Sequence, residues 1–128
     1  MDHRQVVRIL AVTRIVIGAV LVVAPGAAGR RWIGDPATDG RVKLAVRGLG
    51  ARDVALGLGA LRALDRGEPA QSWVQLAAVG DVTDAVSSAL AVRRLGLART
   101  IGTVATAGAA AALGFTAAAQ VDEGNRPA

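Results

Sequence analysis

The sequence predicts an all-α integral membrane protein, a bundle of four short helices joined by short loops. Hydrophobic residues make up 52% of the 128 residues, yet aromatic residues make up only 2%. Ala, Val, Leu and Gly therefore supply nearly all of the apolar volume, which is typical of helices that pack closely in lipid. Four apolar stretches of roughly 20 residues follow one another, and this length crosses about 30 Å of hydrocarbon. Polar connections that carry Arg, Asp, Gly or Pro separate the stretches.

The composition also excludes several classes of function. The chain has no cysteine, so disulfides, thiol catalysis, thiolate zinc sites and Cys-ligated iron–sulfur clusters are excluded. The net charge of +5 is carried almost wholly by Arg, but a nucleic-acid binder would add stacking aromatic residues to a basic face. The arginines instead flank the apolar stretches, as they do beside lipid head groups. We expect a lipid bilayer as partner, no nucleic acid, and no cofactor or metal.

The helices are expected over residues 5–24, 42–64, 72–94 and 99–121, within one transmembrane domain over residues 1–128. The first ends at Pro25-Gly26, a pair that breaks helices. This first stretch resembles a signal peptide, but Arg14 makes its charged region unusually long, so we expect an uncleaved helix. Trp32 and Trp73 lie near predicted helix ends, which fits anchoring at the membrane interface. The heavy use of Ala, Gly and Arg indicates a GC-rich bacterial genome, such as an actinobacterial one.

The second and third stretches carry charges that oppose insertion. On an insertion scale a charge at mid-span costs roughly 2.5–3.5 kcal/mol, whereas each Leu or Val returns only roughly 0.3–0.6 kcal/mol. Neither stretch is expected to insert alone, so partners must neutralise its charges. Arg14 in the first stretch completes a set of three cations and three anions. We predict an intramembrane polar cluster of Arg14, Arg47, Arg52, Asp53, Asp81 and Asp84.

Two interpretations of this cluster remain open. It is either a buried ionic lock that fixes helix packing and register, or it lines a polar cavity for a proton, an ion or a small ligand. The pattern predicts no catalytic, cofactor-binding or metal-binding residue.

The glycines indicate close helix packing. Gly48-x-Gly50 and Gly57-x-Gly59 lie inside an apolar helix, so we interpret them as packing sites rather than phosphate loops. In the fourth stretch, a stripe of small residues that includes Gly114 predicts a tight helix contact, either within the bundle or between protomers.

Three segments carry a resemblance to a known family. They are R-G-L-G-A-R-D at residues 47–53, Ala-Pro at 24–25 followed by R-W-I-G at 31–34, and Gly-Asp at 80–81 leading to Asp84. Over residues 14–90 the chain resembles a family of small bacterial four-helix membrane proteins within the DoxX-like superfamily. Some DoxX relatives are linked to quinone-dependent sulfur oxidation, and others to redox or envelope-stress complexes. The resemblance implies the fold and a role within a membrane complex, but the absence of cysteine argues against the sulfur chemistry.

These observations lead us to expect a multi-pass protein of the bacterial inner (cytoplasmic) membrane. The first hypothesis is a non-catalytic subunit or scaffold of an envelope complex, as a homo-oligomer or within a larger assembly. The second is a small proton-coupled transporter or ligand-binding protein, which a cavity reaching the cluster carboxylates would favour. A third is a membrane enzyme or quinone-binding subunit, which needs a lateral, lipid-facing pocket next to Arg52 and Asp81. A soluble helical protein is the fourth.

Overall fold

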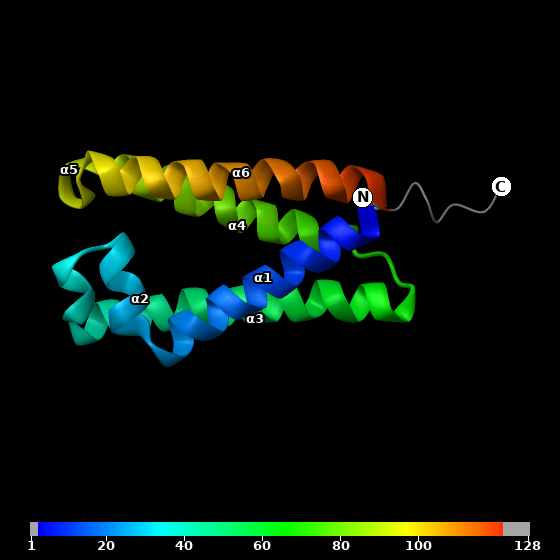
Figure 1. Cartoon of the computed structure of the whole chain (residues 1–128), viewed down its shortest axis with the longest axis horizontal. Coiled ribbons are helices and arrows are strands. Elements are labelled where there is room, and N and C mark those ends of the chain that lie inside the picture. The colour runs from blue at the N-terminus through cyan, green and yellow to red at the C-terminus, as the bar shows by residue number, and fades with distance from the viewer. Residues whose placement is uncertain (1–2, 122–128) are drawn as a thin grey trace.

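The computed structural model describes residues 3–121, and all of the regular secondary structure in that range is helical (Figure 1). The all-α part of the predicted fold class is therefore confirmed. The elements in chain order are α1 (His3–Val23), α2 (Pro25–Trp32), the 3₁₀ helix η1 (Asp35–Thr38), α3 (Gly40–Arg66), α4 (Gln71–Leu90), α5 (Val92–Leu95) and α6 (Leu97–Val121).

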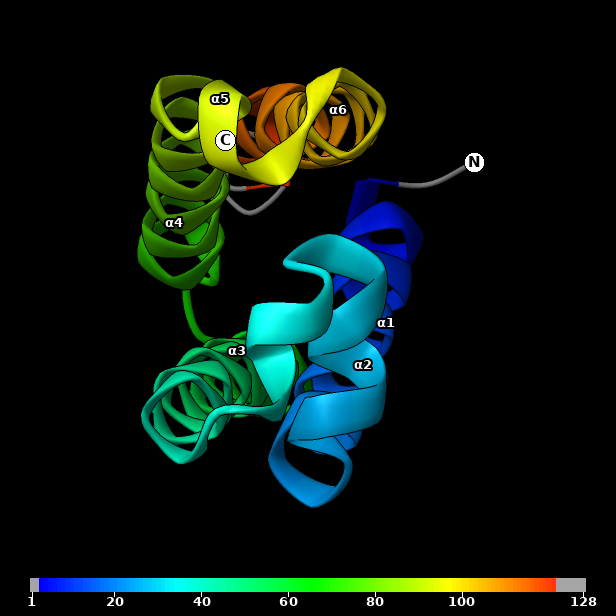
Figure 2. The ribbon, with the colours of Figure 1, turned by 90° about the vertical axis from the view of Figure 1, so that its left-hand side faces the viewer.

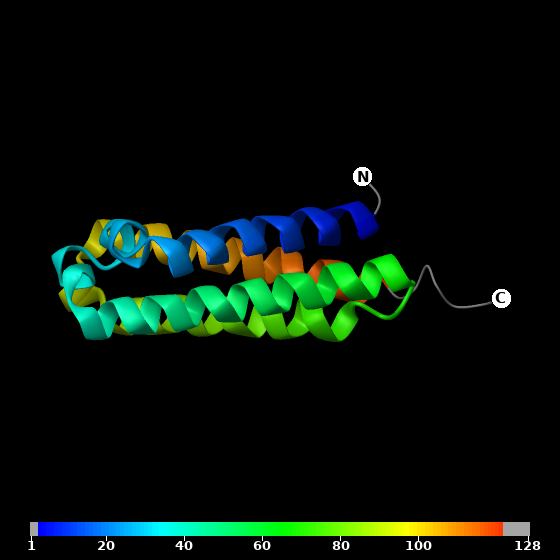
Figure 3. The same cartoon turned by 90° about the horizontal axis from the view of Figure 1, so that it is seen from below.

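The four long helices, α1, α3, α4 and α6, lie side by side as two pairs. α1 packs against α3, and α4 packs against α6, whereas contacts between the two pairs are sparser (Figures 1 and 2). The short helices α2 and η1 lie across one end of the α1–α3 pair (Figure 3). The long helices match the four expected from the sequence, while α2 and η1 are additional. The third expected helix, over residues 72–94, is interrupted at Ala91 and is divided between α4 and α5.

Some helix boundaries differ from the predicted ones, and proline, a capping aspartate and a glycine account for them. Pro25 does end α1, but it also occupies the first turn of α2, where its missing N–H would have no partner in any case. α3 begins earlier than expected because the side chain of Asp39 caps it, accepting a bond of 2.8 Å from the backbone N–H of Arg41. It ends at Gly67, which has a left-handed φ of 67°.

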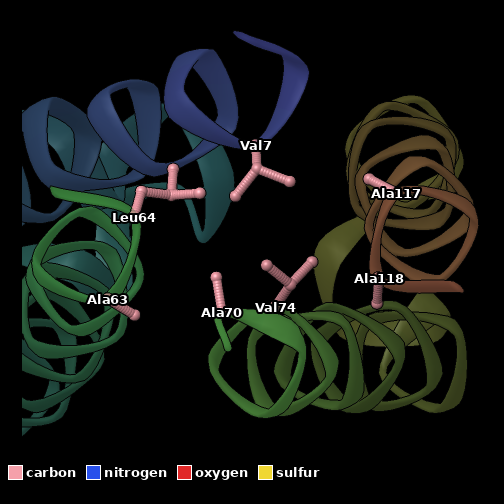
Figure 4. Packing of buried hydrophobic residues seen from close by; sticks show 7 residues of the cluster. All are labelled: Val7, Ala63, Leu64, Ala70, Val74, Ala117 and Ala118. Carbon is pink, nitrogen blue, oxygen red and sulfur yellow. The ribbon is translucent and has the colours of Figure 1, made fainter. Parts of the chain in front are cut away.

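The main hydrophobic core lies at the end of the molecule where α1 begins. All four long helices contribute to it, together with the residue just before α4 (Figure 4). Its members are Val7, Ala63, Leu64, Ala70, Val74, Ala117 and Ala118. Because most of these side chains are small, the helices approach closely at this end.

Close helix packing, which the sequence predicted at four glycines of α3, is confirmed at three of them, and two of these three bring the backbones of α1 and α3 together. A Cβ added to Gly50 would lie 2.5 Å from the carbonyl oxygen of Gly18, and one added to Gly57 would lie 2.7 Å from that of Ala11. Gly59 packs against the ring of Trp73 from α4, whereas Gly48 faces open space.

The pattern of small residues on α6 gives a tight contact at one point. A Cβ added to Gly114 would lie 3.1 Å from the Cβ of Ala78 in α4, whereas Gly102 and Gly108 face open space. The predicted contact is therefore within the molecule at Gly114.

In the part of the chain that the structure describes, two helices are long and apolar enough to cross a membrane. They are His3–Val23, with a mean hydropathy of 2.4, and Leu97–Ala119, with 1.5. Only 17% and 22% of the two apolar windows are buried within the molecule, which distinguishes them from the mostly buried core helix of a soluble protein. An N-terminal signal sequence also meets the measures that α1 meets. α3 and α4 are long enough, but their composition does not meet the same measure.

Candidate functional site

A chain of ion pairs links three of the long helices. Arg14 of α1 donates from Nη1 to Oδ1 of Asp53 in α3 at 3.1 Å, and it also pairs with Asp81 of α4. Arg52 of α3 donates from Nη2 to the same Asp53 oxygen at 3.1 Å and to Oδ2 of Asp84 at 2.9 Å. The order is therefore Asp81–Arg14–Asp53–Arg52–Asp84, and we call these five residues the charge cluster.

The charge cluster is shielded from solvent but not sealed. The exposed fraction of its side chains rises from 11% at Asp81 to 30% at Arg52. Among the side chains that the structure describes, those of residues 3–119, no buried nitrogen or oxygen lacks a hydrogen-bond partner. Each carboxylate is held by at least one guanidinium, which is the arrangement that makes charges tolerable in apolar surroundings.

The close packing of the backbones positions the cluster. The approach of Gly18 to Gly50 brings α1 against α3 and so places Arg14 beside Asp53. Asp81 and Asp84 share one face of α4 because they lie three residues apart. Gly80 leaves room for Arg52, since a Cβ there would lie 3.3 Å from the Cζ of that guanidinium.

The structure brings together five of the six residues that the sequence proposed, and it does not place Arg47 among them. Arg47 is exposed and donates from Nε to the carbonyl oxygen of Val22 at 3.2 Å. It lies five residues before Arg52, a rotation of about 140° around the helix, so the two side chains leave different faces. The sequence also predicted equal numbers of cations and anions in the cluster. This prediction is wrong, because without Arg47 the cluster contains two arginines and three aspartates.

A cavity of about 700 Å³ lies between the α1–α3 pair and the α4–α6 pair. Its volume falls within the range of roughly 300–1,000 Å³ that is typical of small-molecule sites. Most of its wall is aliphatic or small, as at Ile17, Leu56 and Ala107. The sequence did not predict this cavity, although it named a cavity at the carboxylates as the feature that would favour ligand binding.

The polar groups of the cavity fall into two regions. At its middle lie four members of the charge cluster: Arg14, Asp53, Asp81 and Asp84. Arg52 does not line the cavity.

The second polar region lies at the end covered by α2, where the lining includes Arg31, Trp32 and Arg99. The indole Nε1–H of Trp32 donates to Oγ of Ser88 at 3.4 Å, which joins α2 to α4. The Arg99 guanidinium lies against Gly34, where an added Cβ would be 3.4 Å from its Cζ.

We place the opening of the cavity between α1 and α6, because these two helices carry most of its exposed lining residues. Thr13 and Ile17 of α1 and Gly102 and Thr106 of α6 line it and are exposed. Its lining residues on α3 and α4 are buried or half-buried, apart from Trp73. The opening therefore lies between the two helices that qualify as membrane spans.

The comparisons with known proteins add no family to this geometry. No protein-family model, no curated protein and no solved structure matches the chain. The resemblance to DoxX-like membrane proteins accordingly stays a prediction based on the segments quoted above.

Proposed function

We propose that this chain is a small multi-pass protein of the bacterial cytoplasmic membrane that binds a lipid-soluble ligand between its two helix pairs. The observation that carries the proposal is the cavity of about 700 Å³, which contains three carboxylates and opens between α1 and α6. A lateral opening between the two most apolar helices is suited to a ligand that arrives through the hydrocarbon phase.

The distribution of polarity supports four membrane spans. The five residues of the charge cluster pair inside the molecule, while many large aliphatic side chains lie outside. On α4 the exposed aliphatic residues are Leu76, Val79, Val82, Val86 and Leu90. α4 falls below the hydropathy of a span mainly through two aspartates that face inward and are paired, so its outer surface is compatible with lipid. In water, the same surface would expose an extended apolar patch.

The cavity itself defines the kind of ligand. Its walls offer apolar contact along most of their length, and a few polar groups are available to fix orientation. Asp53, Asp81 and Asp84 can accept hydrogen bonds on oxygen lone pairs that their arginine partners leave unused. The ligand is therefore a mostly apolar molecule with a limited number of polar atoms.

A non-catalytic subunit or scaffold is the second candidate, and the pairing within the charge cluster favours it. A cluster in which every member has a partner is also what an ionic lock requires. Such a lock gives no reason for a large cavity beside it, so we rank it second. Purification from native membrane followed by mass spectrometry separates the two: a constant set of partner proteins supports the scaffold, and a co-purifying small molecule supports the binding protein.

The direct test is saturable binding of a neutral, environment-sensitive dye such as Nile red to the protein in phosphatidylcholine nanodiscs. Ala107→Trp fills the cavity, whereas Ala105→Trp places the same side chain on α6 at an exposed position that does not line it. We expect saturable fluorescence for the wild type and Ala105→Trp, and none for Ala107→Trp, with equal helical content by circular dichroism. Equal dye binding by both variants would overturn the proposal.

A further inference from the structure

We infer that the occupant of the cavity is a single-chain amphiphile with an anionic head group, such as a long-chain carboxylate or alkyl phosphate. The head group lies at Arg31 and Arg99, and the hydrocarbon chain runs along α6 toward the hydrophobic core. This inference rests on the proposed function and adds the chemistry of the ligand to it.

The first line of evidence is that two cavity arginines have no counter-ion. Within the part of the chain that the structure describes, no carboxylate pairs with Arg31 or Arg99. Arg99 donates only to the carbonyl oxygen of Leu95, at a long 3.5 Å. Both arginine side chains line the cavity and are exposed, so their donors are open to a ligand. A guanidinium presents several donors in one plane and binds carboxylate or phosphate oxygens two at a time.

The second line of evidence is the order of charges along the cavity. Its middle contains three carboxylates and only Arg14, which already pairs with Asp53 and Asp81. An anionic head group is repelled from this region and attracted to the end where Arg31 and Arg99 lie. The separation of charge therefore fixes which way the ligand points.

The third line of evidence is the wall that faces the charge cluster. From Gly102 through Ala107 and Ala110 to Gly114, α6 presents small, uncharged residues to the cavity. A hydrocarbon chain that passes the level of the carboxylates along this wall contacts small, uncharged side chains of α6, and the carboxylates keep their arginine partners. Beyond it, Val74 closes the cavity at the hydrophobic core, so the site has a polar end and an apolar end.

The experiment is displacement of the neutral dye from the full-length protein in nanodiscs by ligands that share one chain and differ in head group. The ligands are palmitate, hexadecyl phosphate, hexadecanol and hexadecylamine, with acetate and inorganic phosphate as anions without a chain. We expect the two anionic amphiphiles to displace the dye at concentrations about tenfold lower than hexadecanol, since charge-assisted hydrogen bonds add this much affinity. Acetate and inorganic phosphate should displace none, because the chain supplies most of the contact.

The matched variants isolate the two arginines. Arg31→Gln combined with Arg99→Gln should reduce palmitate to the potency of hexadecanol while leaving hexadecanol unchanged. Arg30→Gln combined with Arg93→Gln removes the same charge from the same end but outside this cavity, and should keep the preference for palmitate.

Three results would overturn the inference: equal potency of palmitate and hexadecanol in the wild type, a preference that survives the Arg31 and Arg99 changes, or stronger displacement by hexadecylamine. The wild-type series needs no variant to fold. If the dye shows no saturable binding, the proposed function fails; if hexadecanol and palmitate displace it equally, only the head-group inference fails.

Discussion

Replacement of Gly50 by alanine tests whether α1 and α3 are held together by backbone contact. The added Cβ would lie 2.5 Å from the carbonyl oxygen of Gly18, 2.8 Å from the Cβ of Leu21 and 3.0 Å from the backbone nitrogen of Val22. Ordinary contacts begin at 3.4 Å, so the nearest atoms must separate by about 0.9 Å. Two of the three are backbone atoms, which cannot rotate away. The helices themselves must move apart.

The magnitude follows from two opposing effects. Inserting a methyl group into a packed interior costs about 1–3 kcal/mol, while replacing glycine by alanine inside a helix returns about 0.5–1 kcal/mol. We expect Gly50→Ala to lower the free energy of unfolding by about 1–2 kcal/mol on balance. Because Arg14 and Asp53 meet across this contact, their ion pair should be weakened as well.

The assay is equilibrium unfolding in mixed detergent micelles, followed by far-UV circular dichroism, with Gly48→Ala as the control. Gly48 lies two residues away on the same helix, and an added Cβ would meet nothing within 4 Å. It should therefore raise stability by about 0.5–1 kcal/mol. Equal stabilisation by both alanines would refute close backbone packing of α1 and α3.

Three further predictions concern the cluster, the end near α2 and the outer surface. Arg14→Gln leaves two carboxylates without that partner and should lower the free energy of unfolding by about 3–5 kcal/mol. Arg47→Gln should change it by less than about 0.5 kcal/mol. Equal losses for the two variants, measured by unfolding in detergent, would contradict the geometry of the charge cluster. Gly34→Ala imposes a side chain on a φ of 87° beside Arg99 and should lower stability by about 1 kcal/mol or more, measured by the same unfolding; an unchanged midpoint would argue against that turn. Removal of detergent should precipitate the protein, because its aliphatic residues lie outside; a monodisperse, helical protein in plain buffer by gel filtration would exclude the membrane proposal.

Much of the architecture follows from the sequence because its signals are local. Four apolar stretches, a breaker pair at Pro25-Gly26 and inward-facing aspartates three residues apart are each visible in a short window. The balance of opposite charges among such stretches also points to mutual pairing, and the structure joins Arg14, Arg52 and their aspartate partners in this way.

The remaining features depend on distances between helices, and a short stretch of sequence contains no information about such distances. Arg47 and Arg52 are both arginines of α3. They differ in the direction in which their side chains leave the helix, so Arg47 is exposed and Arg52 belongs to the charge cluster. The cavity depends on the distance between the two helix pairs. The periodicity of apolar residues along a helix does not predict this distance. The short helix α2 was missed because glycine, proline and arginine in that segment also fit a loop. The third helix was predicted to continue to residue 94, whereas the structure interrupts it at Ala91 and gives the last residues to α5.

The position of the hydrophobic core at one end has a mechanical consequence. Val7, Leu64, Val74 and Ala118 join all four long helices near the start of α1, while away from that end the two pairs enclose the cavity instead of a shared apolar interior. The two pairs are joined at that end by apolar contacts and at mid-length by the ion pairs of Arg14 with Asp81 and of Arg52 with Asp84. Widening the gap between α1 and α6 therefore requires these ion pairs to lengthen or break, while the apolar contacts at the start of α1 can stay in place.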